Sequence, residues 1–312
     1  MLQKFDPRNR DILVNINGTL VHRDRAGVSP FDSAVQGGDA VWEGLRVYNG
    51  RVFRLTEHLA RLRSSAKALA FASIPTDAQI TEQIVRTLKA NAMRDGVHIR
   101  ITLTRGVKVT SGMDPRLNQS GPTLIVLAEH KPPVYGSGGI TLITSSVRRF
   151  PPDCLDPKVH HCNLIQSILA KIEANNGGAD DAVMLDTRGF VAETNATHVF
   201  VVQEGRDEET ERRSGAGAEI VTPRCVACPE GITRAVVLEL CAAHGVACAE
   251  RDLSLTEVYR ADEVFCTGTM GELVPVLKVD GRTIGEGKPG PMTQRLTELF
   301  RAITAFEGTP VV

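Results

Sequence analysis

Five short segments of the chain stand out together and cover residues 38–46, 57–62, 191–195, 229–234 and 261–269. The second, fourth and fifth of them carry residue types that can hold an anion. Arg61 can bind phosphate oxygens in pairs, because its guanidinium is a planar fork of donors. The fourth segment opens a run typical of a helix N-terminus, where free N–H groups and the helix dipole attract anions and Thr233 adds a hydroxyl. Each of these three segments alone would be a solvated arginine, a capped helix or a turn, but together they indicate one phosphate site.

In this order the five segments resemble the class IV aminotransferases. That family of pyridoxal-5′-phosphate (PLP) enzymes includes branched-chain aminotransferases, D-amino acid aminotransferases and aminodeoxychorismate lyases, and the resemblance covers about residues 11–300. It implies an α/β (α+β) chain with the two-domain fold type IV, in which a small N-terminal α+β domain precedes a larger C-terminal cofactor-binding domain. It also implies a homodimer in which the partner's small domain completes each active site.

The resemblance assigns roles to the cofactor residues. Arg61 matches the arginine that holds the PLP phosphate. Glu193 matches the glutamate that pairs with the pyridine nitrogen and keeps the ring protonated, so that the cofactor is an electron sink. The other expected phosphate contacts are Ile232, Thr233, Gly268 and Thr269.

The lysine that family members link covalently to PLP is the main departure. A gapless alignment on Asn163 and residues 169–174 places His160 at its position, and Lys158 lies two residues earlier. Side chains two apart in an extended segment share one face, so we expect Lys158 to point the same way and to supply the amine. His160 cannot form the covalent link, although an imidazole can relay protons near neutral pH. Lys171 is an alternative amine, in a helix where we expect it at the surface.

The sequence signals for the substrate-binding residues are less specific than those for the cofactor residues. Arg100 and Arg105 are candidates for binding a substrate carboxylate, although at least one of them is expected to be simply solvated. Trp42 and Tyr48 are expected to line the substrate pocket or to pack in the core. The run 43–46 most resembles branched-chain enzymes, which predicts transfer of an amino group between a branched-chain or other hydrophobic amino acid and a 2-oxo acid. A D-amino acid aminotransferase, an aminodeoxychorismate lyase and a homologue that holds PLP or another metabolite without a covalent link are the alternatives.

Three further side chains have open roles. His198 stands where an asparagine is frequent in the family, and it either lines the cofactor pocket or packs as an ordinary strand histidine. Cys225 and Cys228 form a Cys-x-x-Cys pair. No second pair completes the four ligands of a structural zinc site, so we expect two loop thiols or a redox pair and no metal.

The elements that must position these residues follow from periodicity. Leucines and an alanine recur at steps of four and three over 55–69, which predicts an amphipathic helix. Asn-Gly pairs predict hairpins over 11–18 and 40–54. The remaining predicted helices are 77–94, 163–175, 231–244 and 291–305, and the remaining strands are 98–104, 123–128, 140–147, 181–187, 190–202 and 261–267. Residues 205–218 are expected to form a solvated hairpin extension. The predicted domains are 1–130 and 140–312, joined by a Pro- and Gly-rich linker at 131–139.

The composition of the chain limits the kinds of partner that we expect the protein to bind. The chain has 36 basic and 37 acidic residues, so it lacks the basic excess of a general nucleic-acid binder. No apolar run approaches the ~20 residues that span a bilayer. Seven scattered cysteines do not suggest a disulfide framework. We therefore expect a cytoplasmic protein with small-molecule partners, neither bound to nucleic acid nor inserted in a membrane.

Overall fold

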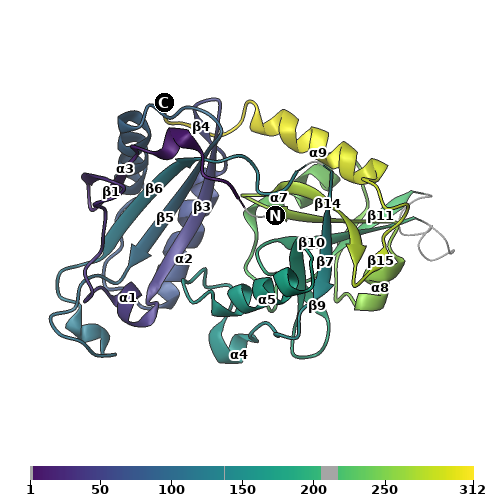
Figure 1. The fold of residues 1–312 in the computed structure, drawn as a ribbon, viewed down its shortest axis with the longest axis horizontal. Coiled ribbons are helices and arrows are strands. Elements are labelled where there is room, and N and C mark those ends of the chain that lie inside the picture. The colour runs from purple at the N-terminus through teal and green to yellow at the C-terminus, as the bar shows by residue number, and fades with distance from the viewer. Residues whose placement is uncertain (1–2, 137, 205–216) are drawn as a thin grey trace. The chain divides into compact units, whose positions relative to one another are not determined.

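The computed structural model describes residues 3–136, 138–204 and 217–312 (Figure 1). Two compact units share the chain. The N-terminal unit comprises Leu2–Pro132, Val159–Asn163 and Thr304–Val312, and the C-terminal unit comprises Pro133–Lys158 and Leu164–Ile303. Residues 159–163 and the C-terminal tail thus pack with the first half of the chain. Of the hairpin extension expected at 205–218, residues 205–216 lie outside the described residues.

The N-terminal unit is built on an antiparallel sheet in the order β16-β4-β3-β5-β6-β1-β2. Both predicted hairpins are confirmed. Their turns lie at Asn17-Gly18 and Asn49-Gly50, where all four residues have positive φ, as a two-residue type I′ turn requires. The strands are β1 (Leu13–Ile16), β2 (Thr19–His22), β3 (Ala40–Tyr48), β4 (Arg51–Val52), β5 (Val97–Thr104), β6 (Thr123–His130) and β16 (Thr309–Pro310).

Two helices pack on one face of this sheet and confirm the periodicity argument. They are α2 (Leu55–Ala68) and α3 (Asp77–Ala90), and the apolar stripe of α2 is buried against β3 and β5 (Figure 1). Alternate residues of β3 meet this core, because side chains two apart share a face. The short helices of the unit are α1 (Ser33–Gly37), η1 (Pro7–Asn9) and η2 (Pro115–Leu117).

The C-terminal unit contains a mixed sheet in the order β12-β11-β10-β13-β14-β7-β8-β9, with β15 paired to β14. Its strands are β7 (Ile140–Thr144), β8 (Asp181–Leu185), β9 (Val191–Thr194), β10 (His198–Glu204), β11 (Ala218–Thr222), β12 (Cys248–Glu250), β13 (Glu263–Gly268), β14 (Glu272–Val279) and β15 (Arg282–Thr283). The single strand predicted at 190–202 is wrong. A turn closed by the Thr197 carbonyl, which accepts from the Thr194 N–H at 2.7 Å, divides it into β9 and β10.

The predicted helices of this unit are confirmed as α5 (Ile165–Asn176), α7 (Ile232–Ala243) and α9 (Pro291–Thr304), to which the structure adds α4 (Pro152–Leu155) and α8 (Leu255–Arg260). Across the described parts of the chain, none of the helices has the length and apolar character needed to cross a membrane.

Candidate active site

A buried carboxylate organises the charged residues of the N-terminal unit. Glu43 lies on the helix-covered face of β3, in line with Val41 and Leu45, and its side chain is 0% exposed. It accepts hydrogen bonds from Arg61 Nε at 2.8 Å and Nη2 at 2.7 Å, and it contacts His58 Nδ1 at 2.6 Å. An unpaired carboxylate in this place would cost several kcal/mol, so these partners explain how the charge is tolerated. The pairing also fixes Arg61.

The ionised form of Glu43 is the stable one. Burial by itself would raise its pKa, but the charge of Arg61 and the hydrogen bonds of Arg61, His160 and His58 hold the pKa well below its usual value. The cluster therefore carries a permanent negative charge that its cationic neighbour balances. Neither Glu43 nor His58 was predicted as a site residue, although an acidic residue inside an apolar strand was a visible signal.

His160 is held in the N-terminal unit by its backbone. The Trp42 N–H donates to the His160 carbonyl at 3.0 Å, and the His160 N–H donates to Ser65 Oγ at 3.0 Å. Residues 159–163 thus lie along the start of β3 like a short added strand. The imidazole stacks on the Trp42 indole with ring centroids 4.3 Å apart.

The neighbours of the imidazole determine its tautomer. Nδ1 lies 2.6 Å from the Trp42 carbonyl and 3.3 Å from Glu43 Oε1, and both oxygens are acceptors. Nδ1 must therefore carry a proton, which leaves the lone pair on Nε2. Burial and the charge of Arg61 lower the pKa of His160, so the neutral ring is favoured. Such a ring can accept a proton at Nε2.

The other candidate substrate residues separate into two places. Arg100 Cζ lies 4.0 Å from the centre of the Trp42 ring, and burial lowers the pKa of its guanidinium. Trp42, Arg100 and His160 are thus brought together. Tyr48 lies six residues further along β3, roughly 20 Å away at strand spacing, where its ring is 5.5 Å from Arg46 Cζ.

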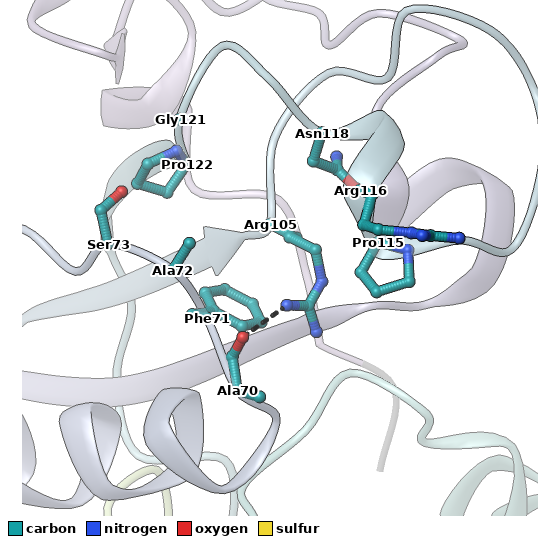
Figure 2. A pocket seen from close by; sticks show the side chains of 10 residues that line it. All are labelled: Ala70, Phe71, Ala72, Ser73, Arg105, Pro115, Arg116, Asn118, Gly121 and Pro122. Carbon is teal, nitrogen blue, oxygen red and sulfur yellow. Dashed lines mark hydrogen bonds between the residues drawn. The ribbon is translucent and has the colours of Figure 1, made fainter.

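Arg105 is engaged by its own unit. Its guanidinium donates to Asp39 Oδ2 at 2.6 Å and Oδ1 at 3.1 Å, and to the carbonyls of Leu69 at 2.6 Å and Ala70 at 3.0 Å. It also lies over the Phe71 ring at 4.5 Å and lines a pocket of about 290 Å³ (Figure 2). A substrate carboxylate would have to displace Asp39 here. This geometry favours a structural role for Arg105 and leaves Arg100 as the more available guanidinium.

Lys158 does not lie in the extended segment that we expected. Residues 157–158 form a turn, in which the Lys158 N–H donates to Asp156 Oδ1 at 2.9 Å and the lysine is exposed. The alternation argument that placed it beside His160 therefore fails. The alternative amine, Lys171, is not a plain surface residue, because it forms an ion pair with the buried Asp181 at 2.9 Å.

In the C-terminal unit, Glu193 lies on β9 with 3% exposure and forms an ion pair with Arg149. Arg149 also donates to Ser167 Oγ at 3.2 Å, and burial lowers the pKa of its guanidinium to about 10. Arg149 was not predicted; the pair of arginines that follows the strand at 140–147 was the only sequence signal for it. A buried carboxylate with a guanidinium neighbour fits the role of a partner for a protonated pyridine nitrogen.

The start of α7 fits an anion. Gly231 is its N-cap, no side chain caps it, and the next residues are the partly exposed Ile232 and the buried Thr233. Backbone N–H groups at such a terminus have no intrahelical partner. Gly268 and Thr269 follow Thr267 at the end of β13, and the Thr267 hydroxyl is buried without a hydrogen-bond partner in the described chain. These unused donors are what a phosphate group would satisfy.

Comparison with known proteins identifies relatives along nearly the whole chain. A family model described as amino-transferase class IV matches residues 40–279. Branched-chain-amino-acid aminotransferase-like protein 2 of Arabidopsis thaliana is 54% identical over 98% of this chain and 52% of its own length. The branched-chain-amino-acid aminotransferase of Pseudomonas aeruginosa is 32% identical over 94% of this chain and 92% of its own.

Two solved structures with a similar fold are also branched-chain aminotransferases. The branched-chain amino acid aminotransferase of Escherichia coli has a TM-score of 0.86 at 28% identity, over 96% of each chain. The enzyme from Thermobaculum terrenum, solved in its PLP form, has a TM-score of 0.81 at 26% identity, over 95% of each chain. The chain spans about half the length of the Arabidopsis relative, whereas it matches the bacterial proteins almost end to end.

Proposed function

This chain belongs to the class IV aminotransferase family, and from that premise we propose that it is a PLP-dependent aminotransferase. Its reaction would move an amino group between a branched-chain or other hydrophobic amino acid and a 2-oxo acid. The names of the relatives support this substrate class. The observation that carries the proposal is the uncapped N-terminus of α7, because its free N–H groups suit the phosphate of the cofactor.

Different residues would bind different parts of the cofactor. PLP, when bound, supplies an electron sink that stabilises negative charge at the substrate α-carbon. Glu193, which forms an ion pair with Arg149, would face the ring nitrogen, and Thr233, Gly268, Thr269 and the buried Thr267 hydroxyl would contact the phosphate. Arg61, oriented by Glu43, would contribute its guanidinium to the phosphate site.

We assign the amine to Lys158 and the proton acceptor to His160. Lys158 is the better candidate because its side chain is exposed and has no ion-pair partner among the described residues, whereas Lys171 is bound to Asp181. His160 offers Nε2, since Nδ1 already donates to the Trp42 carbonyl. Arg100, stacked on Trp42, would bind the substrate carboxylate.

A second candidate function follows from the position of His160. If no lysine reaches the cofactor, the chain would hold PLP or another phosphorylated metabolite by non-covalent contacts alone. The hydrogen bonds that hold His160 where the family has its lysine favour this alternative.

Borohydride trapping separates the two candidates. The protein is loaded with PLP, reduced, digested and mapped by mass spectrometry, and transamination is assayed with L-leucine, L-isoleucine and L-valine against 2-oxoglutarate. We expect a pyridoxyl group on Lys158 and turnover of the L-amino acids. No adduct on any lysine refutes the aminotransferase proposal and supports non-covalent binding. Turnover of D-alanine alone, or release of pyruvate from aminodeoxychorismate, would reassign the chain within the family.

We also propose that the chain is a cytoplasmic homodimer. Four large apolar residues of α5 are exposed at helical spacing and make a stripe that suits an interface between copies: Ile165, Ile168, Leu169 and Ile172. All seven cysteines are free, which suits a reducing compartment. Light scattering of wild type should give twice the chain mass, and Ile168→Asp should shift it toward the monomer. A monomeric wild type refutes the dimer.

A further inference from the structure

A cluster of soft ligands lies in the C-terminal unit, among residues to which the proposed function gives no task. His198, at the start of β10, points toward the Cys-x-x-Cys pair Cys225 and Cys228, and the three ligand atoms all lie within 4.8 Å of one another. Cys228 is 0% exposed, His198 is buried, and Cys225 is partly exposed. Motif spacing offered no reason to join this histidine to the thiols, because it lies on a strand 27 residues before Cys225, whereas the cysteines lie in a loop.

The spacing is close to what a metal requires. A tetrahedral zinc ion with bonds of about 2.0–2.3 Å holds its ligand atoms roughly 3.3–3.8 Å apart. Ligand atoms within 4.8 Å therefore need to close by about 1.5 Å at most. Rotation of a partly exposed side chain such as Cys225 can supply a movement of that size.

The ligand types are those of a zinc site. The thiols of Cys225 and Cys228 are hydrogen-bonded to each other, and the charge of Arg234 acts on both. Thiolates and neutral imidazole are the ligands that zinc and related soft cations bind most strongly.

From this geometry we propose that His198, Cys225 and Cys228 form a binding site for a thiophilic divalent cation of the zinc class. No fourth His, Cys, Asp or Glu of the described residues joins the cluster, so water or a small ligand would complete the coordination. The partly exposed Cys225 gives the ion a path from solvent. A disulfide between the two cysteines is the competing use of this pair, but it gives the histidine no role.

The position of the site links it to the start of α7. A Cβ atom on Gly231 would lie 2.3 Å from the His198 ring, so the imidazole packs directly on the N-cap of that helix. An ion that fixes His198 would therefore also fix the backbone that opens α7. The site can be tested without any cofactor, because none of its three ligands depends on PLP.

The test is metal binding by the full chain, freshly reduced with a phosphine and free of PLP. Zn²⁺ is added, excess ion is removed by gel filtration, and metal per chain is measured by mass spectrometry; Co²⁺ is used in parallel as an optical probe. We expect one ion per chain and a near-ultraviolet thiolate-to-Co²⁺ band. His198→Asn and Cys225→Ser should each weaken binding by at least about 100-fold, since even loss of an outer-shell contact costs 10–100-fold.

Cys248→Ser is the matched control. Cys248 and Cys241 are also hydrogen-bonded to each other, but no histidine of the described chain joins them. The control should bind the ion as wild type does. Failure of reduced wild type to bind one equivalent overturns the proposal, as does equal loss in Cys248→Ser or unchanged binding in His198→Asn. Circular dichroism of both ligand variants shows whether a loss comes from unfolding, and the site is supported only by a variant that keeps the wild-type spectrum.

Discussion

The two units each bury a group of polar side chains, but the groups are completed in different ways. In the N-terminal unit the charge of Glu43 is balanced by Arg61 within 2.8 Å, and His58 and His160 complete the ring of partners. In the C-terminal unit His198, Cys225 and Cys228 bring together one imidazole and two thiols, all of which can bind a metal ion. The first cluster is complete with protein atoms alone, whereas the second gains most from an added cation.

This difference suggests separate roles: the cluster around Glu43 orients other side chains, and the cluster of His198 and the cysteines binds a ligand. A closed cluster orients its members, as Glu43 orients Arg61 and helps to fix the tautomer of His160. An open cluster gathers ligand atoms within 4.8 Å of one another, which is the arrangement of a ligand site. Substitutions should therefore affect stability most in the first cluster and ligand binding most in the second.

Neutralising the buried carboxylate should have the largest effect. In Glu43→Gln the volume is kept but Arg61 loses its counter-charge, and breaking a buried pair in this way costs about 3–5 kcal/mol. We expect a loss of that size in the free energy of unfolding measured by urea denaturation. The matched control is Glu57→Gln on the exposed side of α2, where a surface change should stay within about 0.5 kcal/mol. Equal effects of the two substitutions would show that Glu43 is not the centre of its cluster.

The substitution His160→Lys tests whether an amine at position 160, inside the Glu43 cluster, can replace that of Lys158. Lys158→Ala alone should reduce transamination by at least about 100-fold, because it removes the amine that would attach the cofactor covalently. In the His160→Lys background the same change should cost little, and the trapped pyridoxyl group should map to residue 160. The measurement is kcat for L-leucine in the four proteins of the cycle. Equal losses in both backgrounds would mean that residue 160 does not face the cofactor.

Many helices and hairpins could be predicted because the sequence patterns that determine them involve residues close together in the chain. The stripe of α2 is set by leucine spacing, and the two Asn-Gly turns follow from the backbone freedom of these residues. The division of the strand at 190–202 was missed, since it depends on a Thr194–Thr197 turn within a sequence of strand-like residues. Local propensity does not report such a turn when the flanking residues favour strand.

The candidate site was only partly predictable, because its partners come from distant segments. Arg61 and Glu193 were predicted as site residues from motifs, but their partners Glu43 and Arg149 lie 18 and 44 residues away. Lys158 was misplaced because Asp156 caps a turn where we expected extended backbone. His198 could not be joined to the cysteines until the sheet placed β10 beside their loop.

The substitution Gly231→Ala should perturb the cluster of His198 and the two cysteines and leave the cluster around Glu43 intact. The backbone of Gly231 accepts an alanine (φ −70°), but the new Cβ would lie 2.3 Å from the His198 ring and push it aside. Overpacking of this kind costs about 1–3 kcal/mol. Zinc binding should weaken as well, since the histidine is displaced. Gly37→Ala is the control, because its Cβ would meet nothing within 4 Å. Unchanged zinc binding in Gly231→Ala would separate the histidine from the metal.

His98 gives the smallest effect and extends the comparison to a histidine that belongs to neither cluster. Its Nε2 is buried without a hydrogen-bond partner in the described chain. Burial and the charges of Lys131, Arg46 and Arg100 lower its pKa to about 3. The unfolded chain, with a histidine pKa of about 6.5, therefore binds more protons than the folded chain below that pH.

The stability linked to His98 is fully present above about pH 6.5 and is lost as the pH falls toward 3, by about 1.4 kcal/mol for each pH unit. His98→Gln removes this term, so between pH 6 and 5 its free energy of unfolding should fall by about 1.4 kcal/mol less than that of wild type. Urea denaturation at both pH values measures the difference. Parallel pH dependences in the two proteins would show that His98 can be protonated in the folded state, and would place it with His160 among the histidines that find an acceptor.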